Sequence, residues 1–252
     1  MPARTDRTTD PALRAQLLLA RRGQAFFSRA LNELRNHELD APSLVPGWTR
    51  RHVAAHVGLN ARALTHLTEW AATGVETPMY ASPTERDEEI AFAATLPARA
   101  LRNLSAHAAV HLDVEWRDLE PAAWEAQVRT AQGRVVPARE TVWMRTREVW
   151  VHAVDLDHGA SFRQFPPELV DALLADVVGA WRRRQAAEAI PALVLAPVDR
   201  PDGAALALGA GDGAPLRLRG RAADLAQWAT GRGARGVTRD DGSPPPAPPR
   251  WL

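Results

Sequence analysis

The chain has 252 residues, 46% of them apolar, so it is long enough for one large domain or two modest ones with a substantial core. Its 31 basic and 30 acidic residues leave a formal net charge of +1, which argues against a nucleic-acid partner or an anionic membrane surface. Cysteine is absent, which excludes disulfides, thiolate metal ligands and a cysteine nucleophile.

The N-terminal stretch MPARTDRTTDPALRAQLLLARRG mixes acids with bases and lacks the apolar run of a signal peptide. No later stretch approaches the roughly 20 apolar residues that a membrane-spanning helix needs. A cytoplasmic protein without a membrane partner is therefore expected.

Four long amphipathic helices are predicted in the first two thirds of the chain from apolar residues at helical spacing. Asp10, Thr49 and Gly74 supply cap signals, and QGRVVPARE is expected to form a turn before the last helix. The expected helices cover residues 11–39, 50–74, 87–119 (interrupted near Pro97) and 138–158. Helices of this kind pack as a bundle, which is expected to occupy residues 1–164.

The pattern changes after FRQFPP, where a helix over residues 168–189 precedes three short strand-like runs, ALVLAPV, GAALALG and PLRLRG. A last helix, AADLAQWATG, follows them. These elements predict a small α+β domain with a short antiparallel sheet over residues 165–238. The Pro-rich segment over residues 239–252 is expected to be a disordered tail. The fold class is therefore mainly α.

The helix predicted over residues 138–158 carries an unusual polar stripe within an apolar face. Its members are Thr141, Arg145, Glu148, His152 and Asp155. A stripe in this position points into the bundle, where helical proteins build metal sites from facing side chains. Glu148 and His152 lie one turn apart and can converge on one ion. Their spacing equally fits a buried ion pair between Glu148 and Arg145 beside a hydrogen-bonded histidine.

A third metal ligand would have to come from another helix, and two helices offer histidines. His56 lies among apolar residues, whereas His52 is near its helix start and is expected to be exposed. His107 and His111 have ligand spacing too, with Glu115 next in line, although they fit a solvated helix face as well. Spacing alone does not separate these alternatives.

Three segments together resemble the mycothiol-dependent maleylpyruvate isomerase family, within the DinB-like metal-binding bundles. They are VPGWTRRHVAAHVGLNARAL, VWMRTREVWVHAVDLDHG and LRLRGRAADLAQWATGR. The resemblance implies a DinB-like four-helix bundle followed by a small C-terminal domain. It also implies a divalent metal, with zinc expected, held by His56, Glu148 and His152. His107 and His111 match nothing in the family pattern, which leaves them to the solvated face.

The same resemblance implies a cis–trans isomerase of aromatic-compound catabolism, in the gentisate pathway. Two imidazoles and one carboxylate leave an open position on zinc, where a thiol loses its proton. The implied thiol is mycothiol, which would add to maleylpyruvate, allow rotation about the former double bond and depart to leave fumarylpyruvate. The residues that contact mycothiol are not indicated.

The implied substrate is a dianionic unsaturated keto acid, for which arginine is a suitable clamp. Arg86 and Arg232 stand where the family has site arginines and are expected to bind the substrate carboxylates. Arg145 is a further candidate on the metal helix itself, and Asp155 could orient a ligand histidine as an outer hydrogen-bond acceptor.

Three other functions remain open on the sequence. The metal could activate mycothiol for transfer to another electrophile, or it could activate water for hydrolysis. Alternatively, the chain could be a non-enzymatic module that binds a metal or ligand. The sequence also leaves the oligomeric state open, a monomer included.

Overall fold

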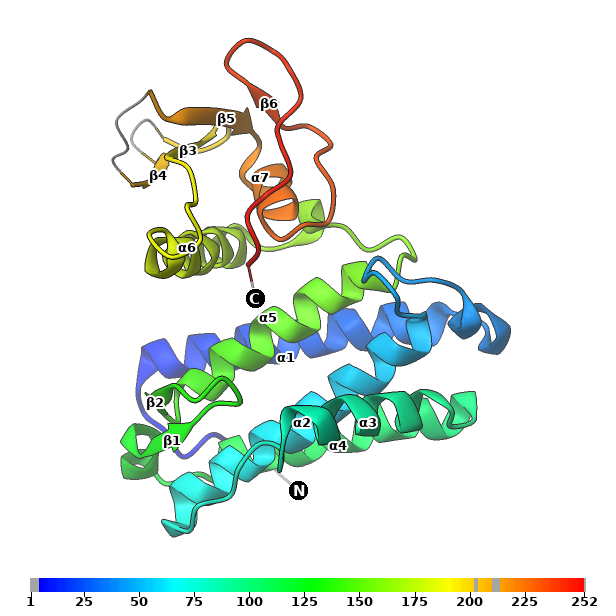
Figure 1. Ribbon diagram of the computed structural model, residues 1–252. Coiled ribbons are helices and arrows are strands. Elements are labelled where there is room, and N and C mark those ends of the chain that lie inside the picture. Colours follow the sequence, from blue (N-terminus) through cyan, green and yellow to red (C-terminus); the bar gives the residue numbers. More distant parts are fainter. Residues whose placement is uncertain (1–4, 202–203, 210–213, 252) are drawn as a thin grey trace. The chain divides into compact units, whose positions relative to one another are not determined.

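A computed structural model describes residues 5–201, 204–209 and 214–251 of the chain (Figure 1). Contacts divide the chain into two compact units, Met1–Ala160 and Ser161–Leu252. Residues 1–4 of the predicted bundle, Gly203 of the run GAALALG and Leu252 of the predicted tail lie outside the described residues.

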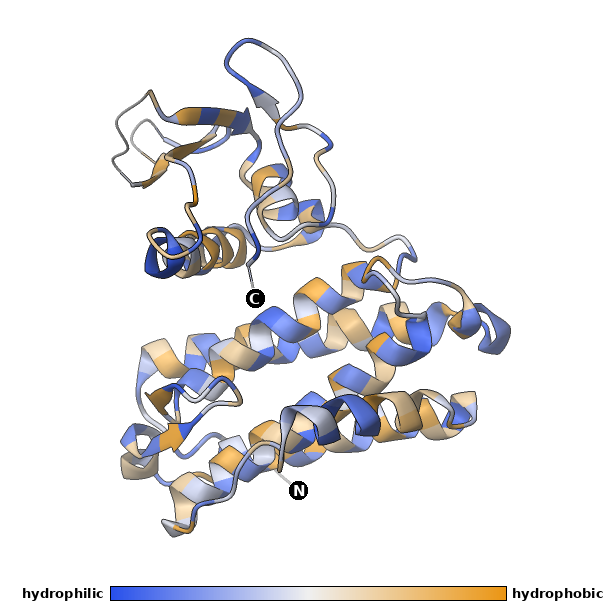
Figure 2. Cartoon of the chain, in the orientation of Figure 1, coloured by the Kyte–Doolittle hydropathy of each residue, from blue (hydrophilic) through white to orange (hydrophobic). Residues whose placement is uncertain are grey.

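The first unit is a helical bundle, which confirms the predicted mainly α fold (Figure 1). Helix α2 packs mainly against α4, and α1 packs mainly against α5. Contacts between α2 and α5 join these two pairs. The α-helices described for this unit are α1 (Pro11–Glu33), α2 (Arg50–Thr73), α3 (Pro83–Ala94), α4 (Ala98–Asp118) and α5 (Glu140–Asp155). Figure 2 shows apolar and polar residues alternating around them, as expected for helices with one buried face.

Local chemistry fixes where these helices begin and end. The Asp10 carboxylate accepts hydrogen bonds from the backbone N–H groups of Ala12 and Leu13 at 2.9 and 3.3 Å, which caps α1. Helix α1 is shorter than predicted, because a 3-10 helix, η1 (Asn36–Asp40), follows it. Pro97 has no N–H with which to continue a helix, so α3 and α4 are separate.

A small hairpin precedes α5 where the sequence indicated only a turn. Strands β1 (Gln127–Arg129) and β2 (Val135–Pro137) pair in antiparallel register, after the 3-10 helix η2 (Pro121–Glu125). Val128 and Val136 face each other in this register and are buried against the bundle core. Each strand has only three residues, too few for a period-two pattern to be recognised.

In its described residues, the second unit combines two α-helices with a four-stranded sheet. After the 3-10 helix η3 (Phe162–Gln164), its elements are α6 (Pro167–Arg184), β3 (Leu193–Pro197), β4 (Leu206–Leu208), β5 (Leu216–Gly220), α7 (Ala222–Ala229) and β6 (Thr238–Arg239). The sheet order is β4-β3-β5-β6. The prediction of an antiparallel sheet was wrong for one pair, because β3 and β5 run parallel. Strand β4 pairs with one edge of β3 in antiparallel orientation. Strand β5 pairs with the other edge of β3 and runs in the same direction as β3.

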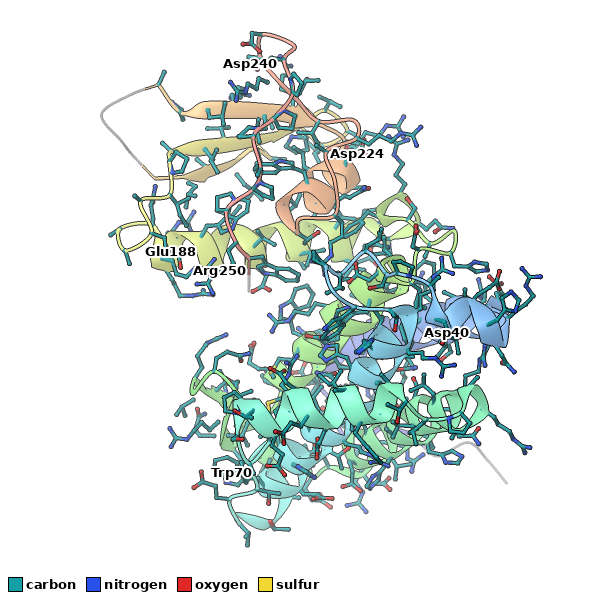
Figure 3. All side chains as sticks on the ribbon, turned by 45° about the vertical axis from the view of Figure 1, so that its right-hand side comes forward. Asp40, Trp70, Glu188, Asp224, Asp240 and Arg250 are labelled. Atoms are coloured by element: carbon teal, nitrogen blue, oxygen red, sulfur yellow. The ribbon has the colours of Figure 1, made fainter. Side chains whose placement is uncertain are left out.

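The Pro-rich segment does not have the disorder predicted for it. Trp228 and Trp181 donate their indole N–H groups to the backbone oxygens of Pro246 and Arg250 at 2.8 and 3.1 Å. The Arg250 guanidinium lies 2.8 Å from the Glu188 carboxylate (Figure 3). Buried indoles need acceptors, and a proline-rich chain has carbonyls free of internal hydrogen bonds. The segment is therefore held by α6 and α7.

Among the described helices, none combines the length and the apolar character required to cross a membrane.

Candidate metal centre

The site forms where α2 and α5 meet in the core of the first unit. Every residue of α2 from Val53 to Ala61 is buried, so His56 is enclosed, with 6% of its surface exposed. Helix α5 presents Glu148 and His152 one turn apart on the side that faces α2. Because this part of α2 is buried, His56 is the histidine that contacts the Glu148–His152 pair.

The donor atoms of the three side chains converge. Glu148 Oε2 lies 2.9 Å from His56 Nε2 and 3.1 Å from His152 Nε2. One ligand atom from each residue lies within 4.8 Å of the others, and this is the one such group found among the described residues. Two donors bound to one tetrahedral zinc at normal bond lengths are about 3.4 Å apart. The two distances from Glu148 are within about 0.5 Å of that value, and the imidazole nitrogens lie within 4.8 Å of each other, so modest side-chain shifts would let the three residues share a divalent metal.

Asp155 fixes the orientation of His152. Its carboxylate is fully buried and lies 2.8 Å from His152 Nδ1, which donates to it. A histidine that gives its Nδ1 hydrogen to a carboxylate presents Nε2 as its ligand atom. Asp155 is thus the hydrogen-bond acceptor for His152 Nδ1.

Burial and neighbouring charges shift the pKa values of the two imidazoles in opposite directions. Burial lowers the pKa of His56, although contact with Glu148 opposes that shift. Burial also disfavours the charged form of His152, but hydrogen bonds to Asp155 and Glu148 outweigh it and raise the His152 pKa to about 9. For Glu148, burial alone would raise the carboxyl pKa, yet the two imidazoles hold it well below its usual value.

Arg145 is buried near the triad but does not pair with Glu148. Its Nη1 donates to the backbone oxygen of Val57 and to Asn60 Oδ1 at 2.7 and 2.8 Å. Its Nη2 donates to Gln24 Oε1 at 2.7 Å. The guanidinium therefore links α5 to α1 and α2. The ion pair considered from the sequence as the alternative to a metal site does not form.

Arg86 reaches the site from the first turns of α3. Its Nη2 lies 3.5 Å from His56 Nδ1, and its guanidinium carbon lies 6.0 Å from the ring centre of Tyr80. Tyr80, the chain's single tyrosine, was not identified from the sequence, although it precedes Arg86 by only six residues. The Trp48 ring lies 5.4 Å from the ring of His56 and forms another wall of the site.

The remaining candidate residues have polar contacts of their own. Arg232 belongs to the second unit, just after α7, where its Nη1 donates to the backbone oxygen of Thr230 at 2.5 Å. His111 is 3.5 Å from Glu115 and its side chain is 55% exposed, so that pair occupies a solvated face of α4. His52 caps the start of α2, where its Nδ1 accepts from the Thr49 N–H at 3.2 Å.

Comparisons with known proteins agree on one family. A profile described as the mycothiol maleylpyruvate isomerase N-terminal domain matches residues 20–157. A crystal structure of a mycothiol-dependent maleylpyruvate isomerase is 45% identical, with a TM-score of 0.88 over 95% of this chain and 97% of that one. A histidine-to-alanine mutant of such an isomerase is 44% identical, with the same coverage and TM-score. A search of curated proteins gave no match.

Proposed function

The chain belongs to the mycothiol-dependent maleylpyruvate isomerase family, and we propose that it converts maleylpyruvate to fumarylpyruvate with mycothiol and a divalent metal. The observation that carries this proposal is the convergence of His56, Glu148 and His152 from two helices. An isomerase of this kind needs a bound thiolate, and the chain has no cysteine to provide one.

The three side chains would hold the metal, with zinc as the ion that suits two imidazoles and one carboxylate. When bound, such an ion supplies a positive charge that favours the thiolate over the thiol. Asp155 keeps His152 in the orientation that a ligand requires. Arg145 acts indirectly. Its hydrogen bonds connect α5 to the part of α2 that carries His56.

Isomerisation needs the cis double bond to become single for a moment. Attack by the mycothiol thiolate forms a carbon–sulfur bond while the π electrons move onto the conjugated carbonyl oxygen. Rotation about the new single bond and expulsion of the thiolate then restore the double bond in the trans form. The protein must hold a dianion during these steps, which requires cationic side chains.

Arg86 is well placed to bind one substrate carboxylate. Its Nη2 can donate to His56 Nδ1 only while that nitrogen carries no proton. An imidazole that uses Nε2 as a ligand carries its proton on Nδ1, so Nη2 would then be available for a carboxylate while Nη1 remains 2.6 Å from Asp87 Oδ1. We propose Arg232 for the second carboxylate, on the family resemblance of the WATGR segment.

Turnover of maleylpyruvate with and without mycothiol tests the proposal. We expect fumarylpyruvate to form with metal-loaded protein only when mycothiol is present, and the mycothiol to be recovered unchanged. Consumption of mycothiol with accumulation of a thioether would instead show a transferase. If metal-loaded protein forms no product of either kind, both proposals fail.

Metal affinity should depend on pH because the metal must displace a proton. In the metal-free protein His152 holds a proton up to about pH 9, whereas the pKa of His56 is lowered and adds no competing proton at neutral pH. Below the His152 pKa, the association constant should therefore rise about tenfold for each pH unit. Chelator competition with Zn²⁺ between pH 6 and pH 9 measures this slope.

Asp155→Asn provides the matched comparison. Without the carboxylate on Nδ1, the pKa of His152 should fall and the pH slope should flatten, while affinity above pH 9 drops 10–100-fold through loss of the outer partner. A Zn²⁺ affinity that does not change between pH 6 and pH 8 in the unmodified protein would contradict this assignment.

A further inference from the structure

A cavity of about 300 Å³ lies between α1 and α4, and none of the three proposed metal ligands lines it. These two helices contact each other much less than either contacts its main partner, which leaves room between them. Apolar side chains form most of the wall: Ala20, Ala106, Ala109, Val110, Leu112, Val114 and Trp116. The volume is at the lower end of small-molecule sites.

Arg145 also lines this cavity, and its charge has no anionic partner in contact. The side chain is only 2% exposed, and its three hydrogen bonds go to neutral oxygens of Gln24, Val57 and Asn60. Within the described part of the chain, no carboxylate lies within ion-pair distance of the guanidinium. A buried charge of this kind is unfavourable unless a counter-ion reaches it.

The other cations along the cavity are already compensated. Arg21 lies 2.6 Å from a carboxylate oxygen of Asp113 and 2.6 Å from one of Asp6. Arg117 lies 3.1 Å from Asp118. The lining therefore combines paired charges with the Arg145 guanidinium, on which the charge of Glu148 acts without an ion-pair contact.

We propose that this cavity binds a small monocarboxylate with an apolar body, with its carboxylate on Arg145 and its body against the alanine-rich wall of α4. Such a site is additional to the isomerase reaction. A guanidinium has five N–H donors, of which neutral oxygens take three, so two remain for a planar carboxylate. One guanidinium without an ion-pair contact suits one carboxylate, unlike the dianion of the proposed reaction. Burial lowers the pKa of Arg145 to about 10, which still leaves it cationic at neutral pH.

Benzoate is a suitable probe, because it joins one carboxylate to a flat apolar ring. Titration followed by ligand-observed NMR should show saturable binding of one benzoate per chain. Benzamide has the ring without the charge, and acetate has the charge without the ring. Each should bind at least tenfold more weakly than benzoate. Benzamide binding as tightly as benzoate would overturn the proposal, because Arg145 would then contribute nothing.

Variants locate the binding within the molecule. Ala109→Trp should fill the cavity and weaken benzoate binding at least tenfold, and Arg145→Met should do the same by removing the charge. Ala100→Trp is the matched control, because Ala100 lies on the same helix but lines a different groove. Thermal unfolding verifies that each variant is folded, and Ala109 is partly exposed, so its replacement leaves the core intact. Unchanged affinity in Ala109→Trp would refute the site.

Glu148→Gln separates this site from the proposed metal centre. Benzoate should bind to Glu148→Gln at least as tightly as to the unmodified protein, because Glu148 does not line the cavity and its negative charge acts on Arg145 in competition with an anion. Loss of benzoate binding in this variant would place the ligand at the metal centre and overturn the proposal. The outcome does not depend on whether the chain isomerises maleylpyruvate.

Discussion

Glu148→Gln is expected to abolish stoichiometric metal binding and to lower isomerase turnover by at least about 100-fold, more than loss of an outer-shell partner usually does. The amide has the size of the carboxylate but neither its charge nor its two equivalent acceptor oxygens. Glu148 Oε2 is the atom that lies within 3.1 Å of both His56 and His152. Removing its charge leaves two neutral imidazoles, which hold a divalent ion weakly.

Metal analysis of the purified variant and steady-state turnover with mycothiol measure both effects. Glu115→Gln is a matched control, since Glu115 also pairs with a histidine one turn away, His111, but on an exposed surface. It should retain full metal content and turnover. A Glu148→Gln protein that still binds one metal per chain would show that the ion is held elsewhere.

Helical spacing was sufficient to predict the Glu148–His152 pair but insufficient to select its partner. His56 and the pair His107 and His111 were all plausible from the sequence, because a histidine every fourth residue is compatible with either a buried or an exposed face. The structure separates them by burial: His56 lies in a run of α2 that is enclosed from Val53 to Ala61, whereas His111 is exposed. Only the family resemblance could choose between them beforehand.

Arg145 shows that residues of one polar stripe on α5 need not belong to one hydrogen-bond network. Arg145 and Glu148 share a face of α5 at a spacing that allows side chains to meet. The Arg145 guanidinium instead donates to acceptors on the neighbouring helices, among them Gln24 on α1. Spacing along a single helix carries no information about which acceptors the neighbouring helices provide.

Long-range pairing explains the other differences between sequence and structure. The parallel β3–β5 pair depends on which edge of β3 is left after β4 has paired, and short apolar strands carry no signal for that choice. The Pro-rich segment is ordered by the indole donors of Trp181 and Trp228, which are distant in sequence. Composition alone therefore predicted disorder where tertiary hydrogen bonds give order.

The contact between α1 and α5 should contribute to the stability of the bundle, and at Gly23 it leaves no room for a Cβ atom. A Cβ atom at Gly23 would lie 2.5 Å from Trp150 Cδ1 and 2.7 Å from Val149 Cγ2. Trp150 cannot easily move, because its indole donates to the backbone oxygen of Leu19 at 3.2 Å and stacks on Phe26. Gly23→Ala should therefore destabilise the protein by about 1–3 kcal/mol, despite the better helix propensity of alanine.

Thermal unfolding of the metal-free protein measures this effect without the contribution of metal binding, and the midpoint should fall by roughly 2–12 °C. Gly179→Ala is the matched control, because Gly179 is also within a helix and its added Cβ would meet only Arg183 Nη1 at 3.6 Å. That change should stabilise its helix by about 0.5–1 kcal/mol.

Gly23→Ala should also weaken metal binding, since Val149 and Trp150 directly follow Glu148 on α5. Equal midpoints for the two variants would mean that α5 can shift freely against α1, and that this packing does not position the ligands.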